Sequence, residues 1–324
     1  MTITKLAWQD LVPDTDSYQE VFTQSDVASE SELTLGDTQP RLQYALEQLL
    51  HPLASSRFLL AKAPEEVEYL GLIADAAGQL LPEDQPVIGG EYHITGRSVT
   101  FTASTDPLAD FGSKNPVVVA DWVEAEQLFG CLRQFNNEIT LQPGLVHQAN
   151  GGVLVISLRT LLAQPLLWMR LKTVITRQRF DWVSFDESRP LPVSVPSMPL
   201  QLKVILVGER DSLADFQEME PELAAQSIYS EYEENLQLTD AETMTQWCQW
   251  VLHIAANAAL PVPAQDAWPV LIREAVRYTG DQETLPLCPL WLVRQLREVA
   301  ALGADTTFDA EQLQTMLSQR EWRE

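Results

Sequence analysis

Three carboxylates stand together near a predicted strand–helix junction. The short apolar segment 58–61 predicts a buried strand, and the helix predicted from about residue 65 to residue 80 begins with Glu65, Glu66 and Glu68. Acidic side chains in the first turn of a helix interact favourably with its dipole and so compete with an external anion. Two like charges about 5 Å apart repel by about 3 kcal/mol at an effective dielectric constant of ~20. The junction therefore favours a capped helix over binding of a triphosphate.

A second stretch of chemical interest is the segment 153–156. It is apolar and β-branched, which predicts a buried parallel strand, and it is followed by Ser157 and Leu158. Hydrolysis of a nucleotide needs carboxylates to hold Mg²⁺ and to prepare the attacking water. A leucine cannot polarise water, and a serine hydroxyl is a poor substitute for a carboxylate on Mg²⁺. These two residues predict that the strand carries no hydrolytic site.

The remaining metal-binding residue types are scattered. Their positions are His51, His93, His147 and His253 for histidine, and Cys131, Cys248 and Cys288 for cysteine. The histidines have no ligand spacing and the cysteines form no CxxC pair, so neither a zinc site nor a disulfide framework is indicated. We therefore predict no catalytic residue and no metal site in these 324 residues.

Strands alternate with helices through most of the chain. Segments 58–61, 117–120, 153–156 and 202–207 predict core strands, a helix begins near Pro40, and another carries Trp168. This alternation predicts an α/β fold with a mostly parallel sheet and right-handed crossovers. After about residue 240 the pattern becomes helical, and helices are predicted near 241–258, 265–279, 289–302 and 309–322, with Asp240 and Asp309 as N-caps.

These patterns divide the chain into three parts. Residues 1–35 predict an acidic N-terminal arm with at most one short helix, residues 36–240 an α/β domain, and residues 241–324 a small all-α lid. Alternating stretches split by Gly and Pro predict a hairpin insertion in the α/β domain at about 81–115.

Five short segments give the chain a family resemblance. They are QPRLQYAL at 39–46, QLFG at 127–130, PGLVHQANGGVL at 143–154, LVGER at 206–210 and FQEMEPEL at 216–223. In this order they resemble AAA+ ATPases, and most closely Lon proteases of the LonB and LonC types. The segment around Gly151 is also similar to magnesium chelatases and bacterial enhancer-binding activators. The resemblance implies a P-loop-type AAA+ parallel-sheet domain followed by a helical lid.

The phosphate-binding loop of this family is altered at every functional position. Such a loop needs glycines, a lysine for the phosphates and a hydroxyl for Mg²⁺. By position, Lys62 and Val67 replace glycines here, Glu68 replaces the lysine and Tyr69 replaces the hydroxyl ligand, while Pro64 lies within the loop. We expect the bulky ring of Tyr69 to fill part of the vacated cleft.

The other nucleotide motifs of the family are altered too. The resemblance puts Ser157 and Leu158 in place of the Mg²⁺-binding Asp and the water-activating Glu, and Glu209 near the position of an Asn that senses the γ-phosphate. The lid of a Lon-like protein offers an arginine to the nucleotide, and Arg294 or Arg297 is a candidate. A solvated or salt-bridged arginine is the competing interpretation. The family's cofactors, ATP and Mg²⁺, are therefore predicted to be lost.

The resemblance implies a Ser-Lys peptidase for the parent protein, but no segment resembles the protease domain. We expect a degenerate AAA+ module that supports assembly, substrate gating or positioning of a C-terminal protease domain without hydrolysing ATP. Expected partners are protein substrates and other copies of the chain, through AAA+ and lid surfaces. Two alternatives stay open: an active ATP-dependent unfoldase with a non-standard nucleotide site, and a stand-alone adaptor that binds another protein.

Composition narrows the classes of partner. With 21 Lys and Arg against 46 Asp and Glu, the formal net charge is −25, which disfavours nucleic acid and anionic lipid. The chain has no uninterrupted apolar run of membrane-spanning length and begins without the apolar core of a secretory signal. A cytoplasmic location is therefore expected.

Overall fold

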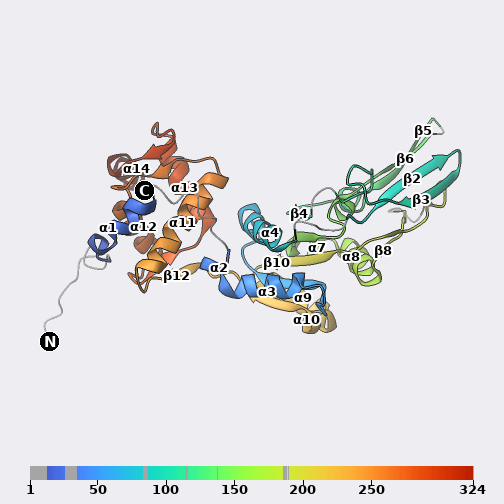
Figure 1. Cartoon of the computed structure of the whole chain (residues 1–324), viewed down its shortest axis with the longest axis horizontal. Helices are drawn as coiled ribbons and strands as arrows, with labels where there is room; N and C mark the ends of the chain where they lie inside the picture. The colour runs from blue at the N-terminus through green and yellow to red at the C-terminus, as the bar shows by residue number, and fades with distance from the viewer. Residues whose placement is uncertain are drawn as a thin grey trace. The chain divides into compact units, whose positions relative to one another are not determined.

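The computed structural model describes residues 13–25, 35–82, 87–113, 116–136, 138–184, 188 and 190–323. The chain divides into two compact units (Figure 1). Residues 41–232 form one of them, called here the α/β unit, and residues 1–40 with 233–324 form the other, called here the helical unit. Within the described ranges, no helix is both long and apolar enough to cross a membrane.

The α/β unit is built on a five-stranded parallel sheet. The strand order is β11–β1–β10–β7–β4, so neighbours in the sheet are distant in sequence and are joined by crossovers. The strands are β1 (Phe58–Lys62), β4 (Val117–Ala120), β7 (Val153–Ser157), β10 (Lys203–Gly208) and β11 (Ile228–Glu231). The predicted α/β fold with a parallel sheet is confirmed.

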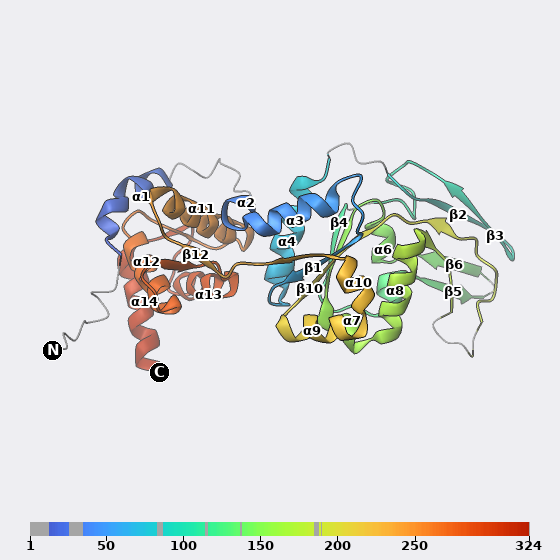
Figure 2. The same cartoon turned by 90° about the horizontal axis from the view of Figure 1, so that it is seen from below.

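Helices cover both faces of this sheet (Figure 2). They are α3 (Pro40–Leu50), α4 (Val67–Leu80), α5 (Ala125–Phe129), α6 (Leu145–Gln148), α7 (Leu158–Ala163), α8 (Pro165–Arg177), α9 (Arg210–Met219) and α10 (Pro221–Gln226). Side chains alternate along a strand, so Leu154 and Ile156 of β7 pack in one cluster with α7, α8 and α9. On the other face α4 lies against β4 and β7, where Gly78 is close to Val117.

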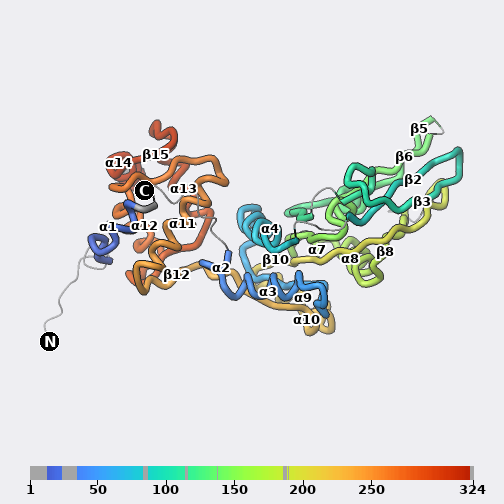
Figure 3. Tube along the Cα trace, viewed as in Figure 1, coloured from blue at the N-terminus to red at the C-terminus, as the bar shows by residue number. Residues whose placement is uncertain are grey.

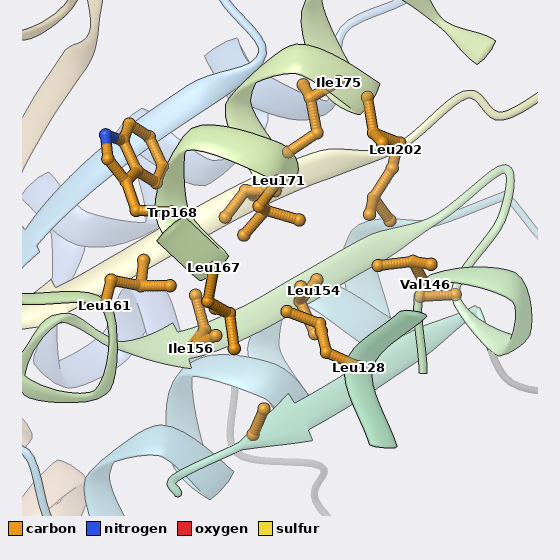
Figure 4. Packing of buried hydrophobic residues seen from close by; sticks show 14 of the residues in the cluster. Leu128, Val146, Leu154, Ile156, Leu161, Leu167, Trp168, Leu171, Ile175 and Leu202 are labelled. Carbon is orange, nitrogen blue, oxygen red and sulfur yellow. The ribbon is translucent and has the colours of Figure 1, made fainter. Parts of the chain in front are cut away.

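The core beside β7 is closely packed (Figure 4). Leu167, Trp168 and Leu171 of α8 lie against Leu154 and Ile156 of the strand, and all five are at most 4% exposed. Trp168 also contacts the rings of Phe58 and Phe216 edge-on. Burial of this apolar surface holds α8 on the sheet, and Trp168 and Lys172 also donate hydrogen bonds to the Glu220 carboxylate.

Two hairpins extend from the α/β unit. The first pairs β2 (Gly90–Thr95) with β3 (Ser98–Ala103), the second pairs β5 (Cys131–Phe135) with β6 (Glu138–Gln142), and a short pair joins β8 (Arg179–Phe180) to β9 (Met198–Pro199). Val99 and Ile139 pack together, so the two hairpins lie side by side (Figure 3). The first hairpin lies within the predicted insertion at 81–115, of which residues 83–86 and 114–115 are outside the described residues.

The helical unit contains the four predicted C-terminal helices. Its elements are η2 (Thr15–Tyr18), α1 (Gln19–Ser25), α2 (Leu35–Thr38), α11 (Ala241–Asn257), α12 (Trp268–Thr279), α13 (Pro289–Ala300) and α14 (Ala310–Arg323). It is not purely helical, because β12 (Asn235–Gln237) pairs with β14 (Thr284–Pro286), and β13 (Val262–Pro263) pairs with β15 (Thr307–Phe308). Asp240 accepts a 2.9 Å hydrogen bond from the Thr243 N–H and caps α11, as the sequence predicts.

Within the segment 1–35 that was predicted as an acidic arm, helix α1 packs in the helical unit. Helix α1 packs against α11, and the ring of Phe22 stacks on Trp268 with centroids 6.3 Å apart. The Gln265 amide donates a 2.7 Å hydrogen bond to the Thr23 hydroxyl. Apolar burial of Phe22 accounts for this docking, while residues 1–12 and 26–34 of the predicted arm lie outside the described residues.

The candidate nucleotide site at the carboxyl edge of the sheet

A buried carboxylate lies at the centre of the candidate site. Glu65 is 3% exposed and lies in the loop between β1 and α4. Its Oε2 atom accepts hydrogen bonds from the Ser157 hydroxyl at 2.5 Å and the Arg159 N–H at 2.7 Å. Its Oε1 atom accepts one from the Ser212 hydroxyl at 2.6 Å, and the Glu209 N–H lies 3.5 Å away. Short contacts of this kind are typical of a charged acceptor.

The sheet topology brings these donors together. Strands β1, β10 and β7 are adjacent and parallel, with Lys62 opposite Gly208 and Val207 opposite Ser157. Their carboxyl ends therefore meet at one edge, and the loops that leave them are neighbours although they are distant in sequence. Ligands of open α/β sheets bind at this edge.

The basic residue of the altered phosphate loop is engaged elsewhere. Lys62 ends β1 and its Nζ lies 2.8 Å from Oε2 of Glu231, at the end of β11. Hydrogen bonds from Lys62 and Tyr229 hold the pKa of Glu231 below its usual value. Pro64 is half-buried in the loop, while Val67 begins α4 and is 56% exposed. The ammonium group of Lys62 thus neutralises a carboxylate of the chain itself.

Tyr69 is buried, as expected of a ring that fills space. It is 2% exposed, and its ring meets Tyr232 edge-on with centroids 5.1 Å apart. Of the three acids near the start of α4, it is Glu65, two residues before the helix begins, whose carboxylate lies at the carboxyl edge of the sheet. Glu68, which the sequence analysis expects in place of a lysine, is half-buried in the first turn of α4.

Leu158 belongs to the hydrophobic core and has no solvent exposure. It begins α7, and its Cδ2 atom lies 2.9 Å from the position that a Cβ on Gly208 would take. The end of β10 therefore needs a glycine to let this leucine pack. A carboxylate at position 158 would point into apolar surroundings.

Three comparisons with known proteins bear on this architecture. A family model described as "LonB-like, AAA domain" matches residues 113–227. The chain is 67% identical over its whole length to a "Putative Lon protease homolog" of Escherichia coli (strain K12), and 32% identical over 291 residues to a protein of that name from Haemophilus influenzae. It spans 55% and 48% of those two relatives, respectively. The chain is an AAA module of the Lon-homologue type.

Solved structures of other AAA-type proteins are more distant. NtrX from Brucella abortus in complex with ADP has 12% identity and a TM-score of 0.46 over 90% of this chain and 56% of its own. A full-length MCM homologue from Methanopyrus kandleri has 13% identity and a TM-score of 0.32 over 96% and 61%. At these scores neither likeness adds to the assignment.

The remaining candidate residues of this Lon-homologue AAA module lie in different settings. Glu209 is exposed at the N-cap of α9, and its side chain makes no capping hydrogen bond. Arg294 and Arg297 are exposed on α13 of the helical unit, where Arg294 pairs with Glu298 at 3.1 Å. Nowhere in the described ranges do three or more His, Cys, Asp or Glu side chains gather as metal ligands.

A second buried polar group lies in the family segment 143–154. His147 is fully buried, accepts a 3.0 Å hydrogen bond from the Gly144 N–H at Nδ1, and stacks on Trp182. Burial and the charge of Arg170 lower its pKa to about 3. Arg170 lies over the Phe129 ring at 4.3 Å, and burial lowers its own pKa to about 10. His147 is therefore neutral and structural.

Sequence reasoning noticed Glu65 only as one of three acids in a helical first turn. It did not foresee that this side chain turns inward or that Ser212 joins Ser157 in binding it. One signal was available: the resemblance implies that Ser157 replaces an acid, and an acid is present across the sheet edge at position 65. The pairing becomes visible only when β1 and β7 are placed two strands apart.

Proposed function

We propose that this chain is a non-hydrolysing AAA module that positions or gates a partner domain instead of driving a nucleotide cycle. The observation that carries the proposal is the buried Glu65 carboxylate, which accepts hydrogen bonds from the end of β7 and from the first turns of α7 and α9. A triphosphate entering this site would meet that negative charge without a loop lysine to offset it, since Lys62 pairs with Glu231.

The lost catalytic groups support the same proposal. Transfer of a phosphoryl group depends on Mg²⁺ ligands and on a residue that orients water. Here Ser157 donates its hydroxyl to Glu65, and Leu158 is buried in the core. Both side chains are committed to the fold, so neither is available to a metal ion or to water.

The names and lengths of the relatives support a proposed role in a wider protein. Both are described as Lon protease homologues and are about twice the length of this chain. We propose that the module assembles with other copies of itself and orients a protease domain toward protein substrates. In this role the unit acts as a fixed scaffold, and its shape is independent of nucleotide.

The test is a direct measurement of nucleotide binding and turnover. Titration of the chain with a fluorescent ATP analogue and Mg²⁺ is expected to give no saturable signal, and phosphate release should equal the buffer rate. An active AAA+ ATPase assayed in parallel supplies the positive control. Micromolar binding with turnover would instead support the active-unfoldase alternative.

A further inference from the structure

Glu65 is the hub of a polar network that joins the ends of the strands. Its two oxygens accept hydrogen bonds from Ser157 at the end of β7 and from the first turns of α7 and α9, while Glu65 itself belongs to the loop after β1. These three donors are two hydroxyls and one backbone N–H. They are the kinds of donor that proteins use to hold an oxyanion.

The network continues to the two outer strands. The Arg159 guanidinium lies 3.4 Å from the Glu65 carbonyl oxygen and 3.7 Å from Oδ1 of Asp121, which follows β4. The Thr160 hydroxyl donates to the Asp121 carbonyl, and on the opposite side Lys62 joins β11 through Glu231. Groups of the chain itself therefore connect the carboxyl ends of all five strands.

Such a hub cannot be removed without consequence. A buried donor that loses its acceptor pays the full desolvation penalty, and the hydroxyl of the fully buried Ser157 donates to Glu65. Glu65 is 3% exposed, so water has little access to replace its carboxylate as the acceptor. The position is therefore built around one negatively charged group with two oxygen atoms.

From these observations we infer that Glu65 is a built-in ligand, a carboxylate that fastens the edge of the sheet in place of a bound anion. The inference rests on the proposed function, because it assumes that no nucleotide occupies this position. It further predicts that truncation of Glu65 leaves an anion site with three donors in place. A small carboxylate such as acetate or formate fits that site.

The test is chemical rescue of the Glu65→Ala chain, followed by thermal unfolding. We expect Glu65→Ala to lower Tm by roughly 5–10 °C. Sodium acetate should restore part of this loss in a saturable manner, whereas sodium chloride at the same ionic strength should not. Glu68→Ala, in the first turn of α4 three residues after Glu65, is the matched control and should melt close to the parent chain with no response to acetate.

Two further variants keep the inference testable where Glu65→Ala does not fold. Ser212→Ala and Glu65→Gln each weaken the same contact, so their combined effect on Tm should be smaller than the sum of the separate effects. Additive effects would overturn the inference, as would a Glu65→Ala chain that melts like the parent or responds to acetate no more than the parent does. Stabilisation of the parent chain by ATP is a separate result, which refutes the proposed function itself.

Discussion

The polar contacts of Glu65 in the α/β unit all join residues that are far apart in sequence, whereas the helical unit combines distant contacts, such as that of Arg320 with Glu298, with contacts that lie within one helical turn. Glu65 binds Ser157 and Ser212, which are 92 and 147 positions away. Asp309 and Gln312 are three positions apart, and Arg294 and Glu298 are four apart. The first kind of contact exists only in the complete tertiary fold, so its loss should affect the whole α/β unit. The second kind depends on a single helix.

The largest expected effect comes from introducing an acid at position 158, in the core of the α/β unit. Leu158→Glu puts a charge where no solvent reaches, and we expect a loss of about 3–5 kcal/mol in the free energy of unfolding, measured by urea denaturation. The double change Ser157→Asp with Leu158→Glu should yield no ATP turnover. Leu158→Met, which conserves volume, should cost less than about 1.5 kcal/mol. A Leu158→Glu chain of unchanged stability would break the contrast between the units.

The next effect depends on pH and concerns His147. Its pKa in the folded protein is about 3, against an ordinary value of 6.5. Below pH 6.5 the unfolded chain therefore binds more protons than the folded chain, and the free energy of unfolding decreases as the pH is lowered. Between pH 7.5 and pH 5 the loss from this residue should be roughly 2 kcal/mol. His147→Gln should remove that part of the pH dependence, while the carboxylates contribute equally to both proteins. Identical pH profiles would show that His147 is not buried as a neutral ring.

A smaller effect is expected at the start of α14. The Gln312 N–H donates to Asp309 at 2.9 Å and the Asp309 N–H donates to the Gln312 side chain at 3.0 Å, a reciprocal cap. Asp309→Ala should cost about 1 kcal/mol and Asp309→Asn only a few tenths, measured by chemical denaturation. Equal losses for the two substitutions would mean that charge, and not capping, stabilises this helix end.

The smallest effect belongs to the lid arginine. Arg294 is 62% exposed and pairs with Glu298 one turn along α13. Removing such a pair should change stability by about 0.3–0.5 kcal/mol, with less effect at high salt. Arg294→Ala should also leave nucleotide binding undetectable, as in the parent chain. A loss of several kcal/mol would show that this contact carries more than a local role.

Periodicity and capping residues predicted the elements well, because those signals act within one segment. The strand 153–156 and the four C-terminal helices are present, and Asp240 caps α11. Glu65 was harder to assign, because its inward orientation depends on Ser157 and Ser212, and a sequence does not give their distance from it. The docking of Phe22 on Trp268 was missed for the same reason, since a short helix in an acidic segment has no signal for its distant partner.

Because the Glu65 carboxylate is part of the polypeptide and not a diffusible ligand, it also limits what the module can sense. A diffusible ligand stabilises a protein in proportion to the logarithm of its concentration, so a nucleotide-binding module reports the supply of nucleotide in the cell. A carboxylate that is part of the chain has a fixed effective concentration, so the extent to which it fills the site does not depend on the concentration of any ligand. Under the proposed function, a module fastened in this way is insensitive to energy charge, and a signal that alters its shape arrives through a surface other than this edge of the sheet.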